Sequence, residues 1–377
     1  MKYLNDLKDE DLKGKYVLLR LDLNVPIVNG EVGDTFRLDR VIETVDYLRL
    51  AGARTIIISH IESGDKTLVP VWHYLNGFFP LEFSPTYFTA EAVDKVAKLE
   101  DKGVILFENL RVNPGEKEND EDFAKKLSQM AEIYVNDAFA VSHRKHASIV
   151  GVPKFLPSYA GILMRQEIEN LGKAFSPTKP FLFVLGGAKF ETKMPLITKF
   201  IEKADKIFLA GALANNIFKE RGLELGTSLV SEVTADLRGI SNSEKVVTPV
   251  DVTVTNSKGE VINRKADELL KDECIVDVGH DTIKQLEVLV NDGKTILWNG
   301  PLGNYELGFQ DKTEVLAKMV ADATSNGVTS IVGGGDTIAS INKLGLNEKF
   351  TFISTGGGAM LDFLVNETLP GIDSLNK

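Results

Sequence analysis

Two stretches of three consecutive glycines follow short apolar runs near the C-terminal end of the sequence. Gly333–Gly335 end the run "IVGGG", and Gly356–Gly358 lie in "STGGGAM", directly before a pattern that predicts a helix. Three residues without side chains let backbone N–H groups approach an anion closely, and the N-terminus of the following helix adds a partial positive charge. We therefore expect phosphate groups to bind beside both triplets.

Charged side chains that could complete a nucleotide site follow similar apolar runs. Asp336 comes directly after the first triplet. It could reach a magnesium ion that bridges phosphates, since Mg²⁺ is usually held by one or two carboxylates and several waters. Lys189 and Lys193 are four residues apart at the start of a predicted helix, a spacing that places both on one side. The sequence contains no GxxxxGK[ST] motif, which excludes the common phosphate loop.

The first half of the sequence carries arginines, histidines and polar side chains at the ends of its apolar runs. Arginine binds planar carboxylate and phosphate groups through paired hydrogen bonds, so this half is predicted to bind a small, multiply anionic ligand. The residues concerned are Asp22, Asn24, Arg37, His60, Glu108, Asn109, Arg111, Asn136, Asp137, His143, Arg144 and His146.

Short apolar runs separated by amphipathic patterns must position these groups. Runs such as "YVLLRLDL", "FLFVLG" and "TILWNG" lack alternation of apolar and polar residues, which is typical of parallel strands buried on both faces. Residues 37–53, "RLDRVIETVDYLRLAGA", have a helical pattern. The carboxyl ends of the strands in open parallel sheets form the ligand crevice. We predict an α/β chain built on doubly wound, Rossmann-like parallel sheets.

The length of the chain predicts two domains. Its 377 residues exceed one ordinary core, and 43% hydrophobic content is enough to fill two. Between the two series of strands, residues 158–180 have a helical pattern that ends in "SPTKP", whose prolines suit a joint. We expect a first domain over residues 1–157, an interdomain helix and hinge over 158–180, and a second domain over 181–365.

Composition narrows the classes of partner and location. A net charge of −11 argues against a general nucleic-acid or anionic-membrane surface. No run approaches the roughly 18 apolar residues of a membrane span, and the first residues contain no apolar segment typical of a secretion signal. The single cysteine, Cys274, cannot form an internal disulfide, which agrees with a reducing compartment. We expect a cytoplasmic protein that binds small molecules, without nucleic acid or membrane.

The sequence resembles the phosphoglycerate kinase family along almost the whole chain. The matching segments, in the order of the family, are "LRLDLNVP", "FENLR", "VNDAFAVSHRKHAS", "GGAKFETK", "WNGPLGNYE", "GGGDT" and "STGGGA". The resemblance implies a glycolytic enzyme that reversibly transfers a phosphoryl group from 1,3-bisphosphoglycerate to ADP, giving 3-phosphoglycerate and ATP. It also implies in-line transfer after domain closure, a monomer, Mg²⁺ bound with ADP or ATP, and a C-terminal segment, 366–377, that returns to the first domain.

The resemblance also implies roles for individual residues. Arg37, Lys189, Gly357 and Gly358 would stabilise the moving phosphoryl group, and Glu306 would bind the ribose while Asp336 binds the metal. The phosphoglycerate would be held by Asp22, Asn24, Arg37, His60, Arg111 and Arg144. The nucleotide would be held by Gly187, Lys189, Lys193, Gly211, Gly279, Asn299, Glu306, Gly334, Gly335, Asp336 and Thr337.

One segment departs from the family pattern. Where the family usually has Ser-His-Leu-Gly-Arg-Pro, this chain has Ser-His-Ile-Glu-Ser-Gly, so that Glu62 and Ser63 replace a glycine and an arginine that faces the substrate. One alternative is therefore a binding or regulatory protein that has lost efficient catalysis. A second is a dinucleotide-dependent oxidoreductase, which the lack of a GxGxxG turn with an acidic residue about twenty positions later disfavours.

Overall fold

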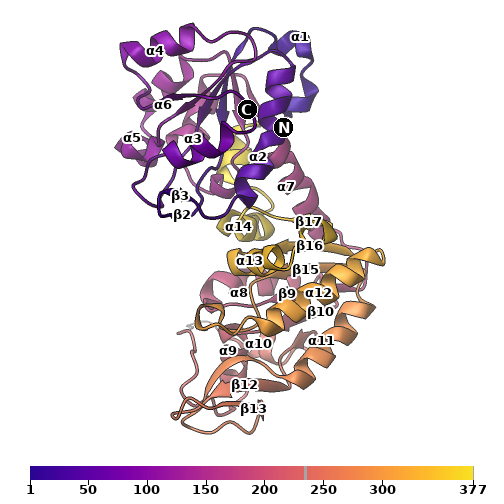
Figure 1. Ribbon diagram of the computed structural model, residues 1–377. Helices are drawn as coiled ribbons and strands as arrows, with labels where there is room; N and C mark the ends of the chain where they lie inside the picture. The colour runs from indigo at the N-terminus through magenta and orange to yellow at the C-terminus, as the bar shows by residue number, and fades with distance from the viewer. Residues whose placement is uncertain (233–235, 377) are drawn as a thin grey trace. The chain divides into compact units, whose positions relative to one another are not determined.

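The computed structural model describes residues 1–232 and 236–376 and divides into two compact units. Unit 1 comprises Met1–Glu169 and Asn366–Lys377, and unit 2 comprises Asn170–Val365. Each unit contains its own six-stranded sheet with helices packed on it (Figure 1). Across the described ranges, no helix is both long and apolar enough to cross a membrane.

The sheet of unit 1 is entirely parallel, with the strand order β5-β6-β4-β1-β7-β8. From the central strand β1 the chain proceeds to β4 on one side and later to β7 on the other, so the ligand crevice is expected at the carboxyl ends of these strands. The strands are β1 (Tyr16–Arg20), β4 (Arg54–Ile58), β5 (Glu82–Ser84), β6 (Val104–Phe107), β7 (Ile133–Asn136) and β8 (Ser158–Ala160), beside a small hairpin of β2 (Ile27–Val28) and β3 (Glu31–Val32).

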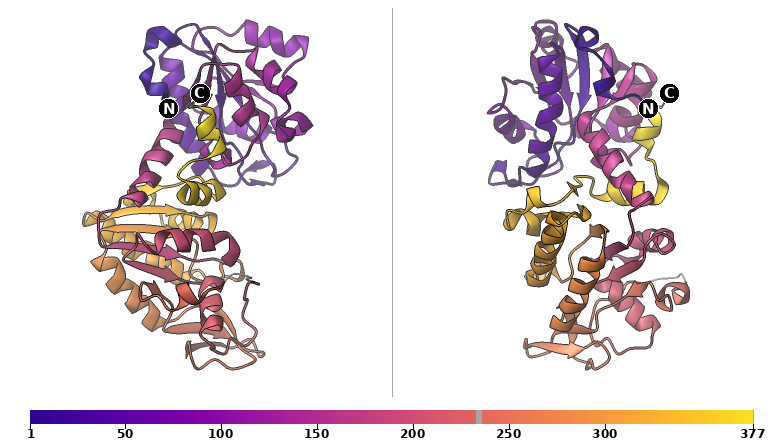
Figure 2. Two further views of the ribbon diagram at one scale, coloured as in Figure 1. Left: turned by 180° about the vertical axis from the view of Figure 1, so that it is seen from behind. Right: turned by 90° about the vertical axis from the view of Figure 1, so that its right-hand side faces the viewer.

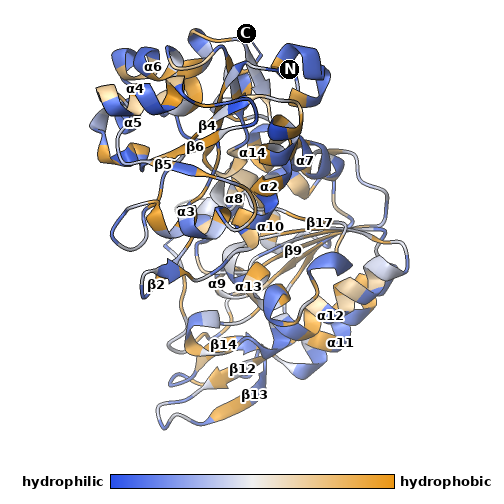
Figure 3. Ribbon diagram, turned by 45° about the horizontal axis from the view of Figure 1, so that its top comes forward, coloured by the Kyte–Doolittle hydropathy of each residue, from blue (hydrophilic) through white to orange (hydrophobic). Residues whose placement is uncertain are grey.

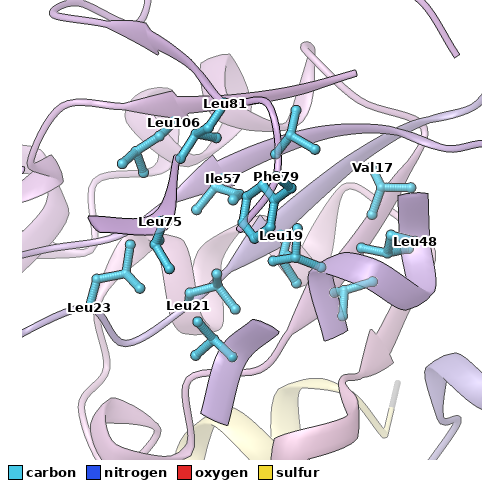
Figure 4. Close-up of a cluster of buried hydrophobic side chains, with 14 of the residues drawn as sticks. Val17, Leu19, Leu21, Leu23, Leu48, Ile57, Leu75, Phe79, Leu81 and Leu106 are labelled. Carbon is cyan, nitrogen blue, oxygen red and sulfur yellow. The ribbon is translucent and has the colours of Figure 1, made fainter. Parts of the chain in front are cut away.

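Helices cover the sheet of unit 1 and bury a continuous apolar core. They are α1 (Asp9–Leu12), α2 (Phe36–Leu50), α3 (Val69–Leu75), α4 (Ala90–Ala97), α5 (Pro114–Glu118), α6 (Glu121–Ser128) and α15 (Pro370–Ser374). Side chains from neighbouring strands, such as Leu19 and Ile57, pack with Leu48 of α2 and Leu75 of α3 (Figure 4). Burying each such side chain contributes about 1.5–3 kcal/mol, which fixes the strand ends that carry the polar residues.

Unit 2 repeats this architecture and adds a second sheet. Its parallel sheet has the order β11-β10-β9-β15-β16-β17, with a switch point between β9 and β15. These strands are β9 (Phe181–Leu185), β10 (Lys206–Leu209), β11 (Val246–Val247), β15 (Thr295–Asn299), β16 (Thr329–Gly333) and β17 (Phe352–Ile353). A separate antiparallel sheet has the order β13-β12-β14, from β12 (Asp251–Thr255), β13 (Val261–Lys265) and β14 (Cys274–Val278).

The helices of unit 2 are amphipathic and connect successive strands. Helices α11 and α12 carry both hydrophilic and hydrophobic stretches, as expected for helices with one face on the sheet (Figure 3). The helices are α8 (Phe190–Phe200), α9 (Ala212–Glu220), α10 (Arg238–Ser241), α11 (His280–Asp292), α12 (Asp311–Ser325), α13 (Gly335–Lys343) and α14 (Gly358–Asn366). Two parallel-sheet α/β units thus confirm the predicted fold class.

Two segments differ from the sequence-based expectation. The run "CIVDVG" forms β14 of the antiparallel sheet, because its neighbour is β12 and not a strand of the parallel sheet. Residues 158–180 are not one continuous helix: they contain β8, α7 (Ile162–Gly172), the short helix η6 (Lys173–Phe175) and an irregular segment that leads into β9. The boundary between the units falls inside α7, after Glu169.

The last helix, α15, packs on unit 1. The backbone N–H of Gly371 donates to the Ser142 carbonyl at 2.8 Å, and Ser374 Oγ donates to the Ile149 carbonyl at 3.1 Å. The two chain ends accordingly lie near each other in both views of Figure 2. Unit 1 therefore contains the beginning and the end of the chain.

Candidate active site

The carboxyl ends of β1, β4 and β6 in unit 1 carry a group of basic side chains. We call Arg20, Arg37, His60, Arg111 and His146 the basic cluster. The ring of His60 is buried, with its Nδ1 3.3 Å from the Arg20 guanidinium. Burial, followed by the charges of Arg20, Arg111 and Arg37, lowers the pKa of His60 far below its usual value. His60 is therefore neutral, and the arginines provide the positive charge.

Asp22 and Asn24, directly after β1, orient Arg37. The Arg37 guanidinium lies 3.0 Å from Asp22 Oδ2 and donates to the Asn24 carbonyl at 2.6 Å. Asp22 Oδ1 also accepts from the Asn24 N–H at 3.2 Å and lies 3.8 Å from His60 Nδ1. Asp22 is thus a buried acid that holds two members of the basic cluster in place.

Arg20 is a fully buried cation that the sequence analysis did not single out. Its guanidinium donates to Ser148 Oγ at 2.8 Å and to the Leu21 carbonyl, and lies 4.0 Å from Glu116. Glu116, equally buried, accepts from the Ser148 hydroxyl at 2.6 Å. A charged residue inside the apolar run "YVLLRLDL" was the available signal for Arg20, whereas nothing in the sequence pointed to Glu116.

Arg111 enters the basic cluster from the turn after β6 and contacts an acidic side chain. Its guanidinium donates to Glu62, while its buried Nε has no hydrogen-bond partner among the described residues. His146 Nδ1 lies 3.9 Å from Glu116, and burial, followed by the charge of Arg111, lowers the pKa of His146 to about 4. Arg144 is exposed and donates from Nε to the neighbouring His143 at 3.0 Å.

Four polar residues at the strand ends form structural contacts, and one of them, Asn109, accepts from the Arg111 N–H at 3.1 Å. Glu108 accepts from the Leu68 N–H, and Asn109 bonds the Ile61 backbone in both directions. Asn136 accepts from the Ala138 N–H. Asp137 accepts from Thr44 Oγ1 and the Met164 N–H, and burial raises its pKa to about 6. These groups shape the loops that carry the arginines.

A cavity of about 250 Å³ lies in unit 2 beside the carboxyl ends of its strands. Ligand pockets commonly measure roughly 300–1,000 Å³, so the enclosed part suits one ring system with further groups outside it. Its wall is mainly apolar, with Gly187 and Gly211 among its members and with the acidic residues Asp277, Glu306 and Asp336. Much of the apolar lining comes from Phe218, Leu229, Val252, Ile275, Val276 and Leu302.

Lys193 and Asp336 place opposite charges near the β9–β15 switch point. Lys193 Nζ donates to the Gly186 carbonyl and, at 3.4 Å, to the Asn299 carbonyl. Burial lowers its pKa to about 8, although Asp336 opposes the shift. Burial and Glu306 raise the pKa of Asp336, whereas Lys193 lowers it. The ammonium group is held by carbonyl oxygens and could exchange them for an anion.

Of the predicted glycines, Gly211 and Gly279 lie where a side chain would collide, whereas Gly335 is open; Gly186, which was not predicted, is also closely packed. A Cβ on Gly186 would stand 1.8 Å from the Pro301 carbonyl oxygen, and one on Gly211 would stand 2.9 Å from that of Gly187. Gly187, Gly211 and Gly334 also have positive φ, the last preceding Gly335 at the start of α13. Gly279 differs from Gly187 and Gly211 because it does not line the cavity, and Asp251 fills the space that its Cβ would occupy.

Asn299 and Thr337 are buried near the switch point. Asn299 ends β15, and its amide Nδ2 lies 3.8 Å from the sulfur of Met360. Thr337 follows Asp336 in the first turn of α13, and its Oγ1 has no hydrogen-bond partner in the described part of the chain. Both can offer hydrogen bonds to a ligand at the end of the sheet.

The second glycine triplet presents open backbone. Gly357 has φ 52° and precedes Gly358, the first residue of α14, and neither has a heavy atom within 4 Å of the place a Cβ would occupy. Lys189 is exposed at the residue before α8. Bare amides, a helix N-terminus and an exposed lysine are groups that bind phosphate. Unit 2 is therefore suited to a phosphorylated ligand with one apolar ring system.

The chain is similar to phosphoglycerate kinases from distant organisms. A family model described as phosphoglycerate kinase matches residues 7–367. The phosphoglycerate kinase of Dictyoglomus turgidum is 40% identical over 389 residues, covering 98% of each chain. The solved structure of the Coxiella burnetii phosphoglycerate kinase has a TM-score of 0.83 at 32% identity, covering 99% of this chain and 98% of the other. That of the Pyrococcus horikoshii enzyme has a TM-score of 0.86 at 31% identity, covering 100% and 98%. This chain belongs to the phosphoglycerate kinase family.

Proposed function

We infer that the protein catalyses reversible transfer of a phosphoryl group from 1,3-bisphosphoglycerate to ADP, giving 3-phosphoglycerate and ATP in glycolysis. The observation that carries this function is the family match over residues 7–367, which spans the two units. The reaction needs one site for a small multiply charged acid and one for an adenine nucleotide. The basic cluster of unit 1 and the cavity of unit 2 have the matching chemistry.

We propose that the acid binds at the basic cluster. Arg37 and Arg111 would pair with its phosphate and carboxylate oxygens, since guanidinium groups form two parallel hydrogen bonds with such groups. Neutral His60 and the amide of Asn24 would add hydrogen bonds, and Asp22 would keep Arg37 in place. The exposed Arg144 would bind from the rim.

We propose that the nucleotide binds unit 2, with its base in the apolar cavity and its phosphates at the glycine-rich strand ends. Glu306, on the cavity wall, would accept hydrogen bonds from the ribose hydroxyls. Lys193 and the amides near Gly187 and Gly334 would face the phosphates. Lys189, Gly357 and Gly358 would stabilise the phosphoryl group during transfer, because N–H and ammonium donors aimed at its oxygens act where charge is redistributed.

The residues at Asp336 fit a magnesium ion that is bound together with nucleotide phosphates. Asp336 lines the cavity, and the unpartnered Oγ1 of Thr337 adds an oxygen to the same turn. The described residues contain no cluster of three or more His, Cys, Asp or Glu that could hold a metal. One carboxylate is nevertheless enough where phosphates and waters complete the shell. Mg²⁺ would neutralise phosphate charge there.

The proposed transfer requires no covalent intermediate and no general base. An acyl phosphate is already an activated donor and the terminal phosphate of ADP is already ionised, so positioning and charge stabilisation suffice. This agrees with a site in which His60 is neutral and buried. Because the proposed ligands bind different units, we propose that transfer follows domain closure, which also excludes water.

A coupled assay tests this function. Purified protein supplied with 3-phosphoglycerate, ATP and Mg²⁺ should form 1,3-bisphosphoglycerate, detected by its reduction with a dehydrogenase and NADH. Nucleotide binding without turnover would contradict the proposal and favour a binding or regulatory protein. Binding of NADH by the chain itself would favour an oxidoreductase.

We further propose that the protein is a cytoplasmic monomer whose partners are small molecules. The net charge of −11 supports the lack of a nucleic-acid partner, because an acidic surface repels a polyanion. Light scattering on the purified protein, with and without duplex RNA, measures the mass of each species. A dimer or an RNA-bound species would contradict this proposal.

A further inference from the structure

The ion pair between Glu62 and Arg111 is asymmetric. The side chain of Arg111 is 9% exposed inside the basic cluster, whereas that of Glu62 is 56% exposed and reaches it from the solvent side. We propose that Glu62 is a built-in competitor whose carboxylate occupies the place at Arg111 that a phosphate group of the substrate takes. Binding then exchanges one anion for another. This inference rests on the proposed function, because it takes the basic cluster as the acid site.

The backbone on either side of Glu62 is held in place by several contacts. The Glu62 N–H donates to Asn24 Oδ1 at 2.9 Å, and Ser63 Oγ accepts from the Ile27 N–H at 2.8 Å. Further along, the Lys66 carbonyl accepts from the Asn109 amide at 2.7 Å. A fixed backbone presents the carboxylate to Arg111, while rotation of the exposed side chain alone can withdraw it.

The acids beside the other arginines of the basic cluster cannot be displaced in this way. Asp22, next to Arg37, is 7% exposed, and Glu116, next to Arg20, is fully buried. Both also accept further hydrogen bonds from the protein. Of these three carboxylates, Glu62 is therefore the one that a ligand can replace at low cost.

Arg111 retains capacity for a second oxygen. Its Nε is buried and unpartnered within the described residues, so the contact with Glu62 uses only part of the guanidinium. A phosphate can engage two donors of the guanidinium at once, since guanidinium and phosphate form bidentate pairs. Exchange of Glu62 for a phosphate would thus satisfy a donor that Glu62 leaves unused.

The exchange favours a ligand group that binds Arg111 more strongly than the Glu62 carboxylate does. A phosphate monoester carries about −1.5 to −2 charges at pH 7, so the guanidinium attracts it more strongly than a carboxylate. Its second pKa is about 6, so binding should weaken as the pH falls below this value. Because Glu62 competes equally with both charge states of the phosphate, its removal should tighten binding by the same factor at each pH.

Calorimetric titration of 3-phosphoglycerate into the full-length protein tests the inference. Glu62→Gln should bind about three- to fivefold more tightly than wild type at pH 7, the range expected when a solvent-exposed ion pair is removed. The affinity ratio between pH 7.5 and pH 5.5 should stay the same, because the competitor weakens binding of both charge states alike. Glu82→Gln removes the same charge from an exposed position on β5 and should leave both quantities unchanged.

A double variant shows whether the effect of Glu62→Gln on binding depends on Arg111. In Arg111→Gln protein, adding Glu62→Gln should no longer tighten binding, because the shared guanidinium is gone. Should Glu62→Gln fold poorly, Glu62→Asp, which shortens the side chain by one methylene, is expected to tighten binding in the same direction. Both variants are compared with wild type by circular dichroism first.

Three results would overturn the inference. Unchanged or weaker binding in Glu62→Gln would mean that Glu62 positions Arg111 and does not compete with the ligand. Equal tightening in Glu82→Gln would indicate a general effect of net charge, and tightening that persists in Arg111→Gln protein would place the competition elsewhere. Failure of the proposed function gives a different result: the wild type would then show neither turnover nor binding of 3-phosphoglycerate.

Discussion

The two units bring charge to a strand end in opposite ways. In unit 1 the charge lies on side chains, and two arginines of the basic cluster contact acids of the protein: Arg37 contacts Asp22 and Arg111 contacts Glu62. In unit 2 it comes from bare backbone around the glycine triplets, with Lys193 held by carbonyl oxygens. At the proposed sites, ligand binding to unit 1 would replace the Glu62–Arg111 ion pair, whereas binding to unit 2 would satisfy donors that have weaker partners.

This difference suits the two proposed ligands. A small acid with charges at both ends is recognised by directional guanidinium groups, and paired arginines remain in position before it arrives. A phosphate chain offers many equivalent oxygens, for which closely spaced amides at helix N-termini are well suited. The partially desolvated Lys193, with a pKa near 8, shows that unit 2 holds a positive charge at some energetic cost.

The largest effect is expected from Lys189→Ala. If this exposed ammonium group follows the moving phosphoryl group as proposed, its loss should lower kcat about 100- to 1,000-fold while ADP affinity changes little, since the proposed contact acts mainly in the transition state. Steady-state kinetics and ADP titration measure the two quantities. Lys219→Ala, on an exposed lysine of the same unit, is the control. Equal losses of kcat and of ADP affinity would count against the transition-state role.

Arg37→Ala should have the next largest effect. The substitution removes the guanidinium group that contacts Asp22, so the buried Asp22 carboxylate loses this cation. Both kcat and phosphoglycerate affinity should therefore fall roughly 10- to 100-fold. Arg54→Ala, at the opposite end of β4, removes the same charge away from the site and should retain activity. An unchanged kcat in Arg37→Ala would contradict a catalytic role of Arg37.

Lys193→Met should increase the free energy of unfolding at pH 7. The folded pKa near 8 lies below the ordinary value, so the protonated lysine opposes folding at pH 7. The variant should then be more stable by about 1–2 kcal/mol, less than the full shift implies because the side chain is partly solvated. This advantage should decline as the pH rises from 8 to 10.5, where the wild-type lysine loses its proton. Urea unfolding across this range measures it, and a less stable variant at pH 7 would refute the argument.

Gly358→Ala should have the smallest effect on stability. The position has no neighbour within 4 Å of a Cβ, so the free energy of unfolding should change by less than about 0.5 kcal/mol. Turnover should still fall about tenfold if the phosphoryl group passes beside this backbone, because a methyl group would obstruct donation from the amides. Gly239→Ala, equally open but in α10, is the control. Full activity in Gly358→Ala would place the phosphoryl group elsewhere.

Much of the architecture could be predicted from the sequence. Unalternating apolar runs predicted the strands, and the pattern over residues 37–53 predicted α2, found at Phe36–Leu50. These patterns are local, because the order of apolar and polar residues within a short segment shows whether a strand is buried on both faces or a helix on one. The pairing of β14 with β12 and the interruption of residues 158–180 depend on contacts between distant residues, which no local pattern contains.

The candidate sites divide in the same way. The sequence alone determined which chemical groups lie at strand ends, since the order of residues shows a glycine triplet or an arginine directly after an apolar run. Only the tertiary structure decided which groups meet: that the buried Arg20 lies near Glu116, that Asp251 fills the space at Gly279, and that Glu62 contacts Arg111. The physical reason is that electrostatic and steric interactions depend on distances of a few ångströms between residues that are far apart along the chain.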